Sequence, residues 1–68
     1  MATVAEGRPY TEHERQAHYE VSRIHEATKA ADAAIDNAKP GALRAAADLI
    51  AVHGHSLGEL AERIEGEQ

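Results

Sequence analysis

The chain contains no cysteine, no phenylalanine and no tryptophan, and its 68 residues include only two tyrosines and one methionine. The absence of cysteine excludes disulfide bonds and thiolate metal sites. The shortage of large side chains predicts a thin core, because 15 of the apolar residues are alanine. A single domain of this composition has no room for a deep ligand pocket of about 300 Å³ or more.

Long hydrophobic runs and an excess of positive charge are also lacking. No apolar run approaches the roughly 20 residues of a membrane span, and residues 1–10 hold no apolar segment typical of a secretory signal. The formal net charge of −5 argues against binding to nucleic-acid phosphates. We therefore expect a cytoplasmic protein that binds neither membranes nor, by itself, nucleic acid. The five arginines against two lysines, together with the alanine, are typical of a GC-rich bacterial or phage genome.

A domain of 68 residues buries too little surface to be more than marginally stable alone. Small scaffolds usually add disulfides, a bound metal or association with another chain. Because disulfides are excluded here, the remaining possibilities are self-association and a metal held by histidine.

Two long helices are predicted after a flexible N-terminal arm over residues 1–10. Thr11 and Glu14 form a capping-box pattern, so the first helix should begin at Glu12. No glycine or proline follows until Pro40, and the first helix is predicted to extend to about Ala38. Residues 11–68 are therefore interpreted as one helical hairpin domain.

Pro40 and Gly41 are predicted to interrupt the helical chain, because proline disfavours a helical conformation in the residue before it. A second helix should then extend from near Ala42 to about Glu65. Its weak position is Gly54, since glycine inside a helix costs about 1 kcal/mol relative to alanine. A kink or break at Gly54 is the alternative interpretation of this second helix.

Inward-facing residues recur with steps of three and four in both helices, which is the heptad pattern of packed helices. In the first helix the predicted inward residues are Ala17, Val21, Ile24, Thr28, Ala31, Ile35 and Ala38. In the second helix they are Leu43, Ala46, Ile50, His53, Leu57, Leu60 and Ile64. Folding the chain at Pro40 places small residues opposite large ones in most layers, with Thr28 opposite His53 as a buried polar layer. The sequence therefore predicts an all-α fold, an antiparallel hairpin of two long helices.

Further apolar residues flank these two series and widen the apolar face of each helix. We predict that they form an interface, and they are Ala27, Ala34, Ala47, Leu49 and Ala61. Because a lone hairpin would leave them in water, we expect a homodimer in the form of a four-helix bundle. In length and layout this arrangement is similar to the small plasmid-copy-control RNA-binding hairpin dimers, without a shared sequence motif. The leading hypothesis is a non-enzymatic module that binds itself and a partner protein, as an adaptor, inhibitor or regulator.

The segment Gly54-His55-Ser56-Leu57-Gly58-Glu59-Leu60-Ala61-Glu62-Arg63-Ile64 carries a second hypothesis. It resembles the second helix of phage-repressor-type helix-turn-helix domains, in which a Ser/Thr-Leu-x-Glu-Leu-Ala-x-Arg string is common. The resemblance implies a transcription-linked accessory protein. In that family the base-reading helix would follow, and the chain stops at Gln68, so we expect DNA contact to require a partner.

Five histidines suggest a histidine-based metal binder as a further alternative. The predicted hairpin brings His25 to the height of His53 and His55, and three histidines are a ligand set that zinc uses. No histidine pair has the i, i+4 spacing of ligands on one helix face. We therefore predict no metal and no cofactor, with these three histidines as the candidates if a metal binds.

Catalytic residue patterns are lacking as well. The serines Ser22 and Ser56 have no evident triad partners, and an enzyme would need such a nucleophile or a perturbed acid or base in a pocket. The acidic residues of the first helix alternate with cations at three-residue spacing, so Glu20 and its neighbours are interpreted as a solvated, salt-bridged surface. We expect that the protein is not an enzyme.

Overall fold

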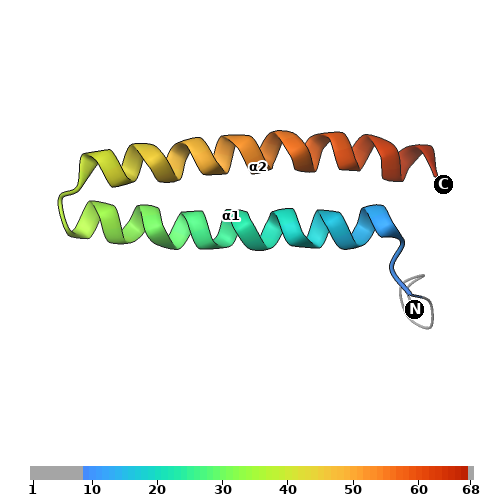
Figure 1. Cartoon of the computed structure of the whole chain (residues 1–68), viewed down its shortest axis with the longest axis horizontal. Coiled ribbons are helices and arrows are strands. Elements are labelled where there is room, and N and C mark those ends of the chain that lie inside the picture. Colours follow the sequence, from blue (N-terminus) through green and yellow to red (C-terminus); the bar gives the residue numbers. More distant parts are fainter. Residues whose placement is uncertain (1–8, 68) are drawn as a thin grey trace.

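The structure is a hairpin of two helices. It is a computed structural model that describes residues 9–67, and it consists of α1 (Glu12–Asp36) and α2 (Pro40–Gly66). The two helices lie side by side and antiparallel, with the turn at one end and the start of α1 beside the end of α2 at the other (Figure 1). This confirms the predicted all-α helical hairpin. Of the predicted N-terminal arm, residues 1–8 lie outside the described part of the chain.

The start of α1 is held by the predicted capping box. The Thr11 hydroxyl accepts a hydrogen bond from the Glu14 backbone N–H at 3.2 Å, and the Glu14 carboxylate accepts one from the Thr11 N–H at 2.8 Å. Glu12 and Glu14 also place negative charge in the first turn, where the helix dipole favours it. Between Thr11 and Gly66, neither helix has the length and apolarity that a membrane span requires.

The turn between the helices is built differently from the prediction. Ala38 adopts a left-handed conformation with φ of 53°. Around it, the Lys39 N–H donates to the Ala34 carbonyl at 2.8 Å and the Ala38 N–H donates to the Ile35 carbonyl at 3.2 Å. These are the two hydrogen bonds of a Schellman motif. As a result α1 ends at Asp36, two residues before the predicted end.

Pro40 is the first residue of α2 and not part of the turn. Proline is favoured at this position because its missing N–H would have no intrahelical partner there. α2 then continues without interruption to Gly66, through Gly54. The alternative prediction of a break at Gly54 is therefore wrong.

The inward face of α2 contains every residue predicted for it, and Ser56 is half-buried as well. Seven residues of α2 are buried or half-buried at the predicted heptad positions: Leu43, Ala46, Ile50, His53, Leu57, Leu60 and Ile64. They include Leu60, the one large side chain among the buried residues described. The heptad pattern therefore determines which way α2 faces.

The inward face of α1 differs from the prediction. The residues turned towards α2 are Ala17, Glu20, Ile24, Ala27, Ala31 and Ala34. Val21, Thr28 and Ile35, which were predicted to be inside, are exposed. The physical reason is that α2 supplies the large side chains, so alanines on α1 let the helices approach closely enough for those side chains to pack.

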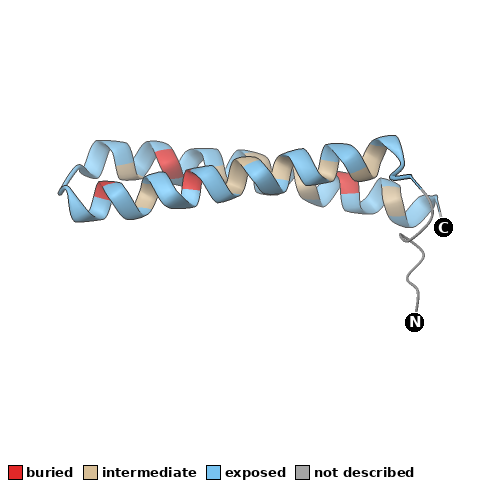
Figure 2. Cartoon of the chain, turned by 90° about the horizontal axis from the view of Figure 1, so that it is seen from below, coloured by how far each residue is buried: buried red, intermediate tan, exposed pale blue. Residues whose placement is uncertain are grey.

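The core that results is thin. Among residues 9–67 the buried residues are Ala27, Ala34, Ala46 and Leu60, and most of both helices is exposed (Figure 2). No described side chain has less than 2% of its surface exposed. Three alanines and one leucine contribute little apolar area, because hydrophobic stabilisation is proportional to the area removed from water.

The conformation of Ala38 yields a stability prediction. Replacing Ala38 with glycine should raise the free energy of unfolding by about 1 kcal/mol, because a side chain in the left-handed region costs about 1–2 kcal/mol. The larger entropy that glycine loses on folding offsets part of this gain. The measurement is urea unfolding followed by circular dichroism. In the matched control Ala30→Gly, at an exposed position inside α1, stability should fall by about 1 kcal/mol. Equal destabilisation by both changes would contradict the assigned turn.

Candidate protein-binding surface

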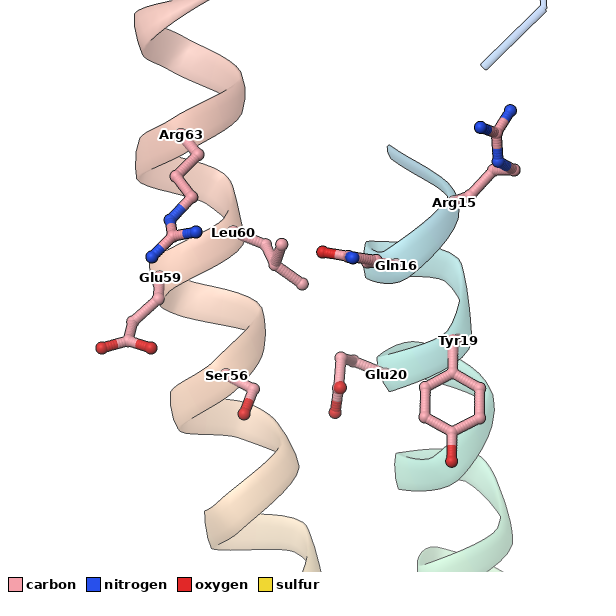
Figure 3. A pocket seen from close by; sticks show the side chains of 8 residues that line it. All are labelled: Arg15, Gln16, Tyr19, Glu20, Ser56, Glu59, Leu60 and Arg63. Carbon is pink, nitrogen blue, oxygen red and sulfur yellow. The ribbon is translucent and has the colours of Figure 1, made fainter. Parts of the chain in front are cut away.

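The two helices leave two long sides of the hairpin open, and the sides differ in chemistry. We call one the polar side, because charged and polar residues line an open hollow of about 500 Å³ there. Figure 3 shows its lining residues: Arg15, Gln16, Tyr19, Glu20, Ser56, Glu59, Leu60 and Arg63. Gln16 and Leu60 point towards each other across the gap, whereas Arg15 points away from it (Figure 3).

The opposite side, which we call the apolar side, has three shallow hollows in a row. It is defined by residues that line these hollows from both helices: Val21, Ile24, Thr28, Ile35, Leu43, Leu57 and Ile64. The hollows extend from Tyr10 at the open end of the hairpin to Pro40 at the turn. The hairpin therefore carries a row of mainly apolar hollows along one side, which are also lined by Glu14, His18, His25 and Lys39.

Two of the predicted interface residues lie in the core. Ala27 and Ala34 are each 4% exposed and lie between α1 and α2, so they are not available to another molecule. Their place on the surface is taken by Val21 and Ile35, which are 38% and 61% exposed. Core and interface positions of α1 are thus exchanged relative to the prediction, because α1 is rotated about its own axis from the predicted orientation.

The other predicted interface residues are exposed on α2, but they do not share one face. Ala47 and Leu49 are two residues apart, so they project about 160° apart around the helix. Leu49 is followed, with steps of three and four, by Val52, Ser56, Glu59 and Arg63, the last three of which line the polar side. Ala47 and Ala61 are each four residues after a residue of the apolar side, Leu43 and Leu57. They therefore lie beside the apolar side.

A polar pair crosses the thin core, but it is not the predicted one. The His53 Nδ1–H donates a hydrogen bond of 2.5 Å to Glu20 Oε1, and the two side chains are 18% and 16% exposed. Thr28 is exposed and its hydroxyl donates to the Ile24 carbonyl of its own helix at 2.9 Å. The predicted Thr28–His53 layer is therefore wrong, and the layer is Glu20–His53.

Sequence reasoning missed Glu20 because its acidic neighbours alternate with cations, which indicated a solvated surface. The spacing of Glu20 along the chain could have identified it as an inward residue. Glu20 lies three residues after Ala17 and four before Ile24, so it occupies an inward heptad position. A second pair joins the helices at the open end, where the His13 Nδ1–H donates to Glu67 Oε2 at 2.5 Å.

The three histidines considered for a metal do not converge. His25 is exposed and lines a hollow on the apolar side, and His53 is engaged by Glu20. His55 is exposed, with its Nε2 3.4 Å from Glu59 of the same helix. Within residues 9–67 no three His, Cys, Asp or Glu side chains are grouped closely enough to hold a metal ion.

The segment that resembles a helix-turn-helix element lies inside one uninterrupted helix. Residues 54–64 belong to α2, which continues without interruption from Pro40 to Gly66. Comparisons with protein-family models, curated proteins and solved structures give no match to this chain. The open apolar side is therefore the feature from which we infer a function.

The Glu20–His53 pair can be tested by a double-mutant cycle. Glu20→Leu and His53→Leu should each leave a half-buried polar group without its partner, whereas the double variant should form an apolar layer at least as stable as the native pair. We expect a coupling energy of about 1 kcal/mol or more from urea unfolding. The exposed pair His55 and Glu59 is the control, with a coupling of a few tenths of a kcal/mol at most. Additive effects of the two leucine substitutions would contradict the pairing.

Proposed function

We propose that this chain is a small non-enzymatic interaction module that associates with a second copy through its apolar side. Two hairpins joined in this way form a four-helix bundle, and the bundle acts as an adaptor, inhibitor or regulator of a partner protein. The observation that carries the proposal is the thin core beside an uncovered apolar side. The hairpin buries mainly alanine, while Val21 and Ile35 remain in water.

The shape of the apolar side supports another helical hairpin as its occupant. Val21, Thr28 and Ile35 repeat every seven residues along α1, and a repeat of seven favours a helix packed lengthwise against it. The hollows between α1 and α2 are shallow and lie in one line, so they suit the ridges of a helix better than a compact ligand. Bundles built from two hairpins bury such faces.

The polar side stays outward in this arrangement and supplies the surface for a partner protein. It carries three exposed residues of the kind that protein interfaces use. Tyr19 lines the hollow beside charged residues, and Leu49 and Val52 precede Ser56 of the hollow at heptad spacing. Aromatic and aliphatic anchors surrounded by polar groups are typical of a non-obligate interface. The dimer would present two copies of this surface.

Matched lysine substitutions on the two sides test the self-association. Light scattering after size exclusion at micromolar concentration should give about twice 7.3 kDa for the native chain. Val21→Lys on the apolar side should dissociate the dimer, because it places two charges in an apolar interface. Leu49→Lys is the control, since Leu49 is 44% exposed against 38% for Val21 and lies on the other side.

A second matched pair guards against local effects. Ile35 and Val52 are 61% and 60% exposed on opposite sides, so Ile35→Lys should weaken the dimer and Val52→Lys should not. Circular dichroism checks that all four variants remain helical. A native chain that is monomeric and cooperatively folded at these concentrations would overturn the proposal.

A further inference from the structure

The flank of α2 beside the apolar side consists of small residues. Their spacing has steps of four, three, four and three, and they are Ala47, Ala51, Gly54, Gly58 and Ala61. We call them the small-residue series, and all five are exposed. Gly54 stands between Ile50 and Leu57 on the helix surface, at distances of four and three residues. The series is thus continuous with the apolar side, where Leu57 and Ile64 line the hollows.

Nothing in the hairpin requires the two glycines of this series. A Cβ atom added at Gly54 or Gly58 would meet no atom within 4 Å, and both glycines lie inside a regular helix, where alanine is the better helix former. The hairpin would therefore be more stable with alanine at both positions. Glycine at these positions is useful where another backbone approaches closely.

Charged residues stand at the two ends of the same series. Arg44 precedes Ala47 by three residues, and Glu65 follows Ala61 by four, so the heptad spacing continues through both. Because α2 rises about 1.5 Å per residue, the two charges are about 32 Å apart and cannot pair within one chain. Within residues 9–67 neither forms an ion pair, and Glu65 lies in the last turn of α2, where the helix dipole disfavours negative charge.

We infer that the second copy docks with its α2 antiparallel to α2 of the first, so that the two small-residue series cross at Gly54. This inference rests on the proposed self-association and specifies its geometry. In this register Arg44 faces Glu65 of the partner subunit, and Glu65 faces the partner subunit's Arg44. Each residue of the series then faces another small residue, which lets the two helix backbones come close. The charges at both ends set the direction, because a parallel arrangement would place like charges together.

A charge exchange tests the register. Arg44→Glu or Glu65→Arg alone should weaken dimerisation about tenfold, because each substitution turns two attractive contacts into repulsive ones. The double variant Arg44→Glu with Glu65→Arg should recover the native dissociation constant to within about threefold. Sedimentation equilibrium over a concentration series measures all three. Glu65→Arg also improves the match to the helix dipole, so weaker dimerisation of this variant cannot be attributed to a weaker helix.

Arg63→Glu is the matched control for charge, since Arg63 lines the polar side and the net charge changes by the same amount. Its dissociation constant should stay within about twofold of the native value. Suppose that Val21→Lys dissociates the dimer, but that the double variant Arg44→Glu with Glu65→Arg does not recover the native dissociation constant. The antiparallel register is then wrong, while the self-association stands. If the native chain is monomeric, both fail.

A steric change tests the close crossing independently of charge. Gly54→Leu should increase helical content and weaken dimerisation at least tenfold, because leucine favours the helix but separates the two backbones. Ala45→Leu is the control, at an exposed position four residues before Leu49 on the other flank of α2, and should leave the dissociation constant unchanged. Unchanged dimerisation of Gly54→Leu would overturn the crossing at Gly54.

Discussion

The packing of small α1 residues against large α2 residues is the contact on which the rest of the structure depends. Ala27 and Ala34 are almost fully buried because the side chains of α2 close over them. This division of sizes brings the helices close, but it also means that α1 contributes little apolar area to the core. Val21 and Ile35 of α1 are then turned sideways, where the hairpin itself offers nothing to cover them, whereas Ile24 is half-buried.

Polar pairs complete this core instead of interrupting it. Glu20 and His53 face each other between the helices, and their hydrogen bond satisfies two groups that would otherwise be costly to enclose. A pair of this kind adds little net stability, yet it disfavours alternative alignments in which one member is buried without the other. His13 and Glu67 join the helices again at the open end, so directional contacts supplement weak hydrophobic packing along the hairpin.

The two open sides follow from the same geometry. A hairpin of two straight helices covers only one strip of each, and the remaining surface must face water or another molecule. On the apolar side, Val21 and Ile35 of α1 lie beside the small-residue flank of α2, which favours a second helical hairpin as the partner. On the polar side, Leu49 and Val52 are exposed, at heptad spacing from Ser56 and Glu59 of the hollow. Because the two sides differ in this way, we expect a second copy to dock on the apolar side and not on the polar side.

The sequence by itself determined those features that depend on local interactions or on one unambiguous pattern. The capping box placed the start of α1 because both partners lie within one turn. The heptad series identified the inward face of α2, because five of its seven residues are large and aliphatic and no other face of that helix has such a series. On α1 two overlapping heptad series share Ala17, Ile24 and Ala31, and both satisfy the pattern. Only packing against α2 decided between them, since the space between the helices admits alanine more readily than valine or isoleucine. The same holds for Glu20, whose place in the core depends on His53 of the other helix. The left-handed conformation of Ala38 is closed by hydrogen bonds within residues 34–39, but the position carries alanine where glycine or asparagine would have signalled it.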